Sequence, residues 1–166
     1  MMSLLTVRIV AATVAFISLT RCESPTAPLP REGAPDELRF VYGGFTMEAV
    51  TVELDGTAVA MWRTPWDWRP GVAIDTIRSV PTEAAWREFW VAAERAGVRR
   101  WRPRYAAEGV LDGDGWTLHL AAGDFRLTST GSNAYPDALG REHELEMTEA
   151  FQSFRSALGT LVGEDL

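Results

Sequence analysis

The sequence predicts an α+β domain, with a mainly antiparallel sheet of about five or six strands and two helices packed on one face. Two observations support this fold class. Short apolar runs separated by turn residues fill much of the chain after residue 35, and two longer segments repeat apolar residues at helical spacing. Strands and helices do not alternate regularly, as they would in a parallel βαβ sheet, so an antiparallel sheet is expected.

The expected strands are short apolar runs bounded by turn residues, and they fall at 37–42, 48–54, 57–63, 71–80, 117–120 and 125–130. Asp55-Gly56 lies between the second and third runs. Asp-Gly between two β-rich runs is a strong hairpin signal, because both turn positions favour positive φ. The break at Ala122-Gly123-Asp124 predicts a second hairpin in the same way.

Two helices are expected, one between Thr82 and Gly97 and one from Thr148 to Val162. Each threonine supplies an N-cap hydroxyl, and glycine is a common residue just after a helix. The apolar residues within each segment recur at helical spacing, so each helix should bury one face; they are Trp86, Phe89, Trp90, Ala93 and Ala96, then Phe151, Phe154, Leu158, Leu161 and Val162.

The composition excludes several classes of function. The net charge is -7, with 16 basic residues that are all arginine, whereas a general nucleic-acid binder needs a dominant basic face. The same charge argues against adhesion to an anionic membrane by electrostatics alone. A single cysteine excludes an intrachain disulfide and any CxxC metal or redox motif.

The N-terminus resembles a secretory signal peptide. Residues 9–19 form an uncharged apolar run preceded by Arg8, and the run is too short for a stable transmembrane helix, which needs about 20 apolar residues. A buried first helix of the domain is the alternative. The proline-rich stretch that follows separates this run from the rest of the chain and favours the signal peptide.

Leu19-Thr20-Arg21-Cys22 resembles the lipobox of bacterial lipoproteins, although Arg21 replaces the small residue usual before the cysteine. The resemblance implies a signal peptide over 1–21, lipidation of Cys22, a membrane anchor and a place in the cell envelope. Prolines are frequent in 22–35, which predicts an extended spacer that reaches about 40 Å. A single domain is expected over 36–166. An uncleaved signal-anchor and ordinary secretion are the alternatives.

No catalytic or metal-binding set is evident in the domain, and neither a cofactor nor a metal is expected. His119 and His143 lack the partner spacing of a zinc or iron site, and there is no GxSxG nucleophile motif. Asp112-Gly113-Asp114-Gly115 is followed by residues that cannot complete a calcium shell, so a tight turn is expected there.

Three groups of residues are candidates for ligand binding. Trp62, Trp66 and Trp68 could form a stacking platform for a sugar or an anchor for a protein partner, or could close the edge of the core. Arg99, Arg100 and Arg102 lie in an arginine-rich stretch that could bind an anion or balance nearby acids. The third group is Asn133 and Tyr135, which could line a small pocket or join a loop through hydrogen bonds.

Trp116 and the segment 129–137 together resemble uncharacterised bacterial envelope proteins, which carry a tryptophan-bearing strand and then a strand that ends in a Ser-x-Gly-Ser-Asn-x-x-Pro turn. Gly131 and Asn133 in this turn are expected to tolerate left-handed backbone, and no activity follows from the resemblance. The sequence therefore predicts a cell-envelope lipoprotein that binds a ligand or partner. A tethered hydrolase and an inhibitor or immunity-type protein that docks a partner enzyme are the alternatives.

Overall fold

The computed structural model describes residues 27–45, 47–70, 74–110 and 112–166. The predicted signal peptide over 1–21 and the predicted lipidation site at Cys22 lie outside these residues. Within the described ranges, the chain has no helix that is both long enough and apolar enough to cross a bilayer.

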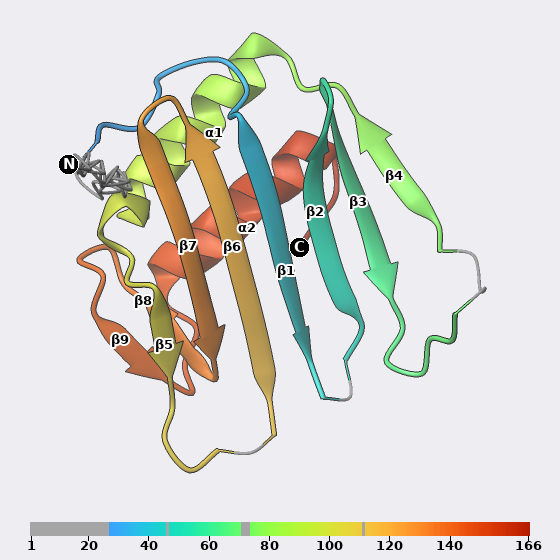
Figure 1. Cartoon of the computed structure of the whole chain (residues 1–166), viewed down its shortest axis with the longest axis vertical. Coiled ribbons are helices and arrows are strands. Elements are labelled where there is room, and N and C mark those ends of the chain that lie inside the picture. The colour runs from blue at the N-terminus through green and yellow to red at the C-terminus, as the bar shows by residue number, and fades with distance from the viewer. Residues whose placement is uncertain (1–26, 46, 71–73, 111) are drawn as a thin grey trace, which may run out of the picture.

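The described chain folds into one large sheet, a two-stranded sheet and two α-helices, so the predicted α+β class is confirmed (Figure 1). The large sheet has the order β4-β3-β2-β1-β6-β7-β5. Its strands are β1 (Glu37–Gly44), β2 (Ala49–Asp55), β3 (Ala58–Thr64), β4 (Thr76–Ser79), β5 (Arg104–Ala106), β6 (Asp114–Ala122) and β7 (Phe125–Ser132). Neighbours are antiparallel, except that β5 runs parallel to β7.

Both predicted hairpins are confirmed. Asp55 pairs with Ala58 across the first turn, where Gly56 has φ of 65°, and Ala122 pairs with Phe125 across the second. Positive φ at Gly56 is the conformation that the Asp-Gly signal predicts, because glycine has no Cβ to oppose it.

The predicted strand count is wrong, because the large sheet has seven strands and a second sheet pairs β8 (Ala134–Pro136) with β9 (Glu142–Glu144). The sequence reading missed β5, β8 and β9. Each has only three residues, which is too short to show the period-two alternation that identifies a strand.

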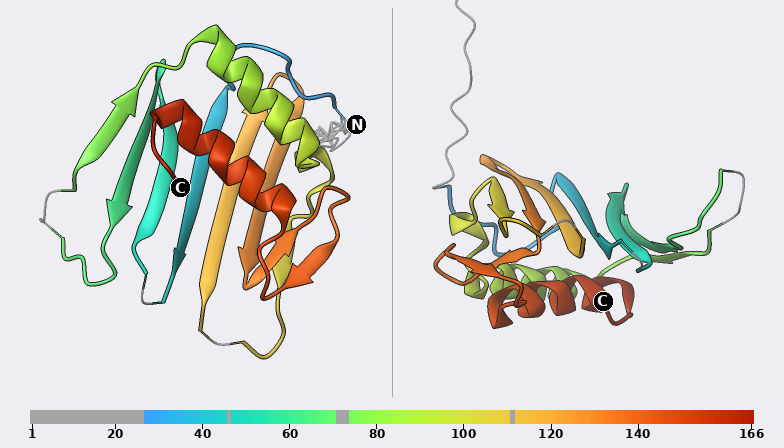
Figure 2. Two further views of the ribbon diagram at one scale, coloured as in Figure 1. Left: turned by 180° about the vertical axis from the view of Figure 1, so that it is seen from behind. Right: turned by 90° about the horizontal axis from the view of Figure 1, so that it is seen from below.

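The two helices are α1 (Glu83–Arg95) and α2 (Glu149–Val162), and both pack on the same face of the large sheet (Figure 2). The predicted caps are confirmed: the Thr82 hydroxyl accepts a hydrogen bond from the Ala85 N–H, and the Thr148 hydroxyl accepts one from the Phe151 N–H, each 3.1 Å long. Gly97, with φ of 70°, follows α1 and leads into a short 3-10 helix, η1 (Val98–Arg100).

The core between the helices and the sheet is rich in aromatic rings. Phe151 and Phe154 of α2 each lie 6.1 Å from Phe40 of β1, measured between ring centroids, and Phe154 lies 5.9 Å from Phe89 of α1. All four side chains are essentially buried. These contacts fix both helices on the sheet, because rings at such distances add to the hydrophobic term.

Residues 27–35 contact the domain, although they belong to the stretch 22–35 that the sequence reading assigned to a spacer. Leu29 is only 9% exposed and joins the core cluster. The indole N–H of Trp90 donates a 2.8 Å hydrogen bond to the carbonyl of Gly33, which holds the segment beside α1. The part of the chain that packs on the domain therefore begins before residue 36.

Candidate functional site

The tryptophan cluster lies at one end of the large sheet. Trp62 is half-buried on β3, whereas Trp66 and Trp68 lie in the loop after β3 and are 71% and 39% exposed. This exposure of Trp66 and Trp68 favours the binding interpretation over the interpretation that the tryptophans close the edge of the core. Side chains with this exposure are accessible to a ligand or partner.

A second loop adds two apolar side chains at the same end of the sheet. Phe45 and Met47, between β1 and β2, are 74% and 47% exposed. Ala49 pairs with Thr64 where β2 begins and β3 ends, so the two loops leave neighbouring strands at one end (Figure 1). We define Phe45, Met47, Trp66 and Trp68 as the aromatic loop surface.

A hollow of about 350 Å³ beside β3 is lined in part by residues of both loops. Glu48 from one loop and Pro65 and Trp68 from the other contribute to its lining, together with Trp62. Nearby, the Arg63 guanidinium donates a 2.9 Å hydrogen bond to the carbonyl of Asp165, which joins β3 to the C-terminal segment after α2. The base of the aromatic loop surface is therefore attached to the folded body of the domain.

The sequence reading missed Phe45 and Met47 as candidates. The only signal for them is their place in a short apolar stretch directly after Gly43-Gly44, where a strand was expected to end. An apolar residue at a turn has no buried face to join, so its exposure can be expected once the turn is located.

His119 does not belong to a catalytic arrangement of the serine hydrolase type. It projects from β6 on the sheet face opposite the helices, in a cross-strand row with Arg39 and Glu53 on one side and Thr128 on the other. Arg39 pairs with Glu53 at 2.8 Å, and His119 Nδ1 lies 3.3 Å from the Thr128 hydroxyl oxygen. Glu53 is two strands, or about 10 Å, from His119, so it cannot orient the imidazole.

The described residues also contain no group of three or more His, Cys, Asp or Glu side chains placed to hold a metal ion. His143 Nε2 lies 3.3 Å from Asp137 Oδ2, and the Arg141 guanidinium contacts the same carboxylate oxygen at 2.6 Å. This cluster fixes the turn between β8 and β9.

The candidate arginines Arg100 and Arg102 have different partners. The Arg100 guanidinium donates to the carbonyl of Ala138 at 3.0 Å. Arg102 pairs with Glu142 at 3.4 Å and lies 4.8 Å from the ring centroid of Tyr105. These contacts hold η1 and β5 against the small sheet, so the arrangement favours a structural role for Arg100 and Arg102.

Asn133 and Tyr135 join backbone segments through hydrogen bonds. The Asn133 side chain accepts from the Asp114 N–H at 2.8 Å and donates to the Asp112 carbonyl at 3.2 Å. The expected left-handed backbone is confirmed at Asn133, with φ of 51°, but Gly131 is not among the described residues of positive φ. Gly131 is instead required because the indole of Trp116 lies directly against its Cα.

A buried polar cluster that the sequence reading missed lies beside Tyr135. The hydroxyls of Tyr42 and Tyr135 both donate to Asp114 Oδ2, at 2.6 and 3.1 Å, and the Arg155 guanidinium lies 4.1 Å from the Tyr42 ring centroid. Burial, followed by the hydrogen bond to the Asp114 carboxylate, raises the pKa of Tyr42 to about 12. Burial and the nearby charges also raise the pKa of Tyr135. This cluster joins β1, β6, β8 and α2.

We expect Tyr42 and Tyr135 to stay un-ionised in the folded protein at pH 10. The chain has three tyrosines, and burial is the main cause that raises the pKa of Tyr42, Tyr105 and Tyr135 above the ordinary 10.0. Because the pKa is raised in the folded state, the stability that each neutral hydroxyl contributes is fully present below pH 10 and is lost as pH rises. For Tyr42 this loss occurs between pH 10 and about 12. In an alkaline titration, phenolate absorbance should therefore appear together with loss of circular dichroism.

Tyr42→Phe is the control for this titration. The variant removes one of the groups whose ionisation opposes folding, so its stability should fall less steeply with pH above 10. Ionisation of all three tyrosines near pH 10 while the circular dichroism stays native would contradict the expectation.

Comparison of the chain with known protein-family models gives no match, and comparison with curated proteins gives no relative. The function is therefore argued from the chemistry and exposure of the site itself.

Proposed function

We propose that this chain is a lipid-anchored protein of the cell envelope whose α+β domain binds a protein partner through the aromatic loop surface and does not itself catalyse a reaction. The observation that carries this proposal is the exposure of four large apolar side chains on two neighbouring loops, with Trp66 at 71% and Phe45 at 74%. Large exposed apolar side chains that gather at one end of a fold mark interaction sites in folded proteins.

The composition of the surface favours a protein partner over a sugar. Aromatic residues, methionine and arginine are enriched at protein interfaces, and lysine is depleted. Phe45, Met47 and the two exposed tryptophans match this pattern, and the exposed Arg69 lies in the same loop as Trp66. An inhibitor or immunity-type protein that docks a partner enzyme is one form of this function.

The anchor is supported by the lipobox-like stretch that ends at Cys22. A diacylated cysteine buries methylene groups worth about 0.8 kcal/mol each, and two acyl chains hold a protein stably at a bilayer.

Site-specific photocrosslinking in the native organism tests the docking function. A photoreactive residue at position 66 should give a discrete crosslinked protein, identified by mass spectrometry, because this side chain would lie in the interface. The same residue at position 139 is the matched control, since Leu139 is 60% exposed on the turn between β8 and β9, away from this surface. Phe45→Ser should remove the adduct at position 66. Identical adducts at both positions, or none at position 66, would contradict the proposal.

Cys22→Ser tests the anchor separately. The unaltered chain should partition with membranes and show an N-terminal mass for acylated Cys22, whereas the variant should remain in the soluble fraction or keep its leader. A free thiol in the mature protein, or equal release of both proteins, would remove the lipid anchor without affecting the crosslinking result.

A further inference from the structure

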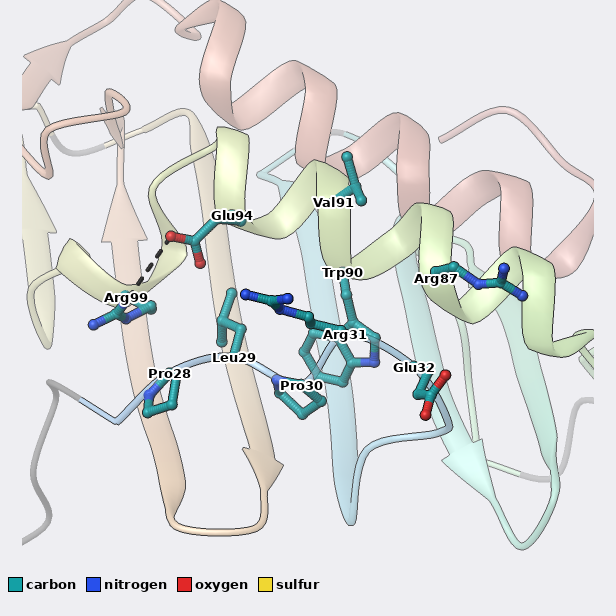
Figure 3. A pocket seen from close by; sticks show the side chains of 10 residues that line it. All are labelled: Pro28, Leu29, Pro30, Arg31, Glu32, Arg87, Trp90, Val91, Glu94 and Arg99. Atoms are coloured by element: carbon teal, nitrogen blue, oxygen red, sulfur yellow. Dashed lines mark ion pairs between the residues drawn. The ribbon is translucent and has the colours of Figure 1, made fainter.

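A pocket of about 550 Å³ lies between α1 and the segment 28–32, at a place that the proposed docking function does not use (Figure 3). We call it the α1 pocket. Its volume is within the range typical of small-molecule sites. Leu29 and Trp90 are buried at 9% and 2% exposure and form its apolar floor, and Pro28 and Pro30 extend this apolar surface.

The Trp90 side chain offers no free polar atom to the α1 pocket. The indole N–H of Trp90 is already used, because it donates to the Gly33 carbonyl at 2.8 Å. This bond also holds the segment 28–32 beside α1. The floor therefore offers an apolar surface to the nonpolar part of a ligand.

The rim of the pocket is rich in guanidinium groups. Three arginines and two glutamates line it, in a chain whose net charge is -7. Glu94 and Arg99 approach each other at 3.7 Å. Among the described residues, neither Arg31 nor Arg87 forms an ion pair or a side-chain hydrogen bond, so their positive charges are not neutralised by direct contact.

The two unpaired arginines lie at different ends of the pocket. Figure 3 shows Arg31 extending toward the end where Glu94 and Arg99 lie, whereas Arg87 lies at the other end, with Glu32. Arg31 therefore presents an unpaired guanidinium at the end of the pocket where the Glu94–Arg99 ion pair lies. A guanidinium group binds phosphate and carboxylate oxygens through strong charge-assisted hydrogen bonds.

We infer that the α1 pocket binds an amphiphile with an oxyanion head group, an alkyl phosphate or alkyl carboxylate, with the head group at Arg31 and the alkyl chain on Leu29 and Trp90. Charge complementarity at the rim and the apolar floor together select this class of ligand. The site depends on neither the lipid anchor nor the aromatic loop surface.

Calorimetric titration of the full chain carrying Cys22→Ser tests the inference, with decyl phosphate as the probe. Inorganic phosphate presents the head group without the chain, and decanol presents the chain without the charge. Decyl phosphate should bind at least about tenfold more tightly than either, because each half of the pocket contributes to binding. Equal affinity for decanol or for inorganic phosphate would overturn the inference.

Arg31→Gln should weaken decyl phosphate binding at least about tenfold, the effect of losing one charge-assisted contact. Arg31 is exposed and has no ion-pair partner among the described residues, so the variant should keep the native circular dichroism. Arg87→Gln is the matched control, because it removes the same charge from the other end of the same pocket. It should change the affinity by less than about threefold. Unchanged binding in Arg31→Gln, or equal losses in the two variants, would overturn the assignment of the head group to Arg31.

Discussion

Phe151→Ala should lower the free energy of unfolding by about 3–5 kcal/mol, the cost of removing a fully buried phenylalanine from a core. The ring of Phe151 lies 4.9 Å from that of Trp116, 5.1 Å from Tyr135 and 5.7 Å from Trp101, measured between centroids. These rings belong to the sheet, to the small sheet and to the segment after η1. Truncation would therefore leave a cavity where three parts of the fold meet.

Urea denaturation followed by circular dichroism would measure this effect. Gln152→Ala is the matched control, because Gln152 is the next residue of α2 and faces solvent, and it should change the stability by less than about 0.5 kcal/mol. Domains of this size are typically stable by about 5–15 kcal/mol, so the Phe151 variant should lose a large part of its total stability. A loss below about 1 kcal/mol would mean that the core does not close around this ring.

Gly131→Ala should destabilise the protein by about 3 kcal/mol or more, although it adds only one methyl group. A Cβ on Gly131 would overlap the indole nitrogen of Trp116 and lie 2.6 Å from the carbonyl oxygen of Ala134. These are the two partners of a buried 2.9 Å hydrogen bond, in which Trp116 Nε1–H donates to that carbonyl. The methyl group would separate them, so the variant would combine overpacking with two unsatisfied buried polar groups.

Gly115→Ala is the matched control for this substitution. Gly115 lies on the neighbouring strand β6, and its nearest contact to an added Cβ is 3.7 Å, an ordinary van der Waals distance. It should change the stability by less than about 1 kcal/mol and can even stabilise the strand. Equal effects of the two substitutions in thermal or urea unfolding would contradict the close approach of Trp116 to Gly131.

The elements that the sequence predicts well are those with local signals. The Asp55-Gly56 turn, the Thr82 and Thr148 caps and the two apolar helical stripes each depend on neighbours within a few residues. Such signals can be recognised in a single sequence because the residues that favour each turn, cap or helix are close to one another along the chain.

The missed elements are very short, and some of them pair with distant parts of the chain. Strand β5 forms because Arg104–Ala106 can pair in parallel with Thr130–Ser132, and β8 forms because β9 returns beside it after the turn at Asp137. The contact of Leu29 with the core is of the same kind. No periodic pattern in a three-residue stretch can reveal a partner far along the chain.

The candidate site likewise has parts that local sequence signals predict and parts that only the fold reveals. The sequence identifies the tryptophans, but only the fold shows that Trp66 and Trp68 are exposed beside Phe45 and Met47. The clustering of arginines between residues 95 and 104 suggests one anion site, yet Arg100 and Arg102 bond to the loop and strand of the small sheet. Proximity in sequence does not determine side-chain direction, because η1 and the extended residues after it point successive side chains to different neighbours.

The packing of Leu29 on the core limits how far an anchored domain could move from a bilayer. Five residues, 23–27, separate the proposed acylation site at Cys22 from the segment held beside α1, and an extended chain from residue 22 to residue 28 spans about 20 Å, half of the reach expected for the whole proline-rich stretch. The segment 28–32 lies beside α1, whereas the loops after β1 and β3 lie at the far end of the sheet (Figure 1). Anchorage at Cys22 would thus orient the molecule with its tryptophans directed toward the aqueous compartment, where a partner would approach without competing with lipid.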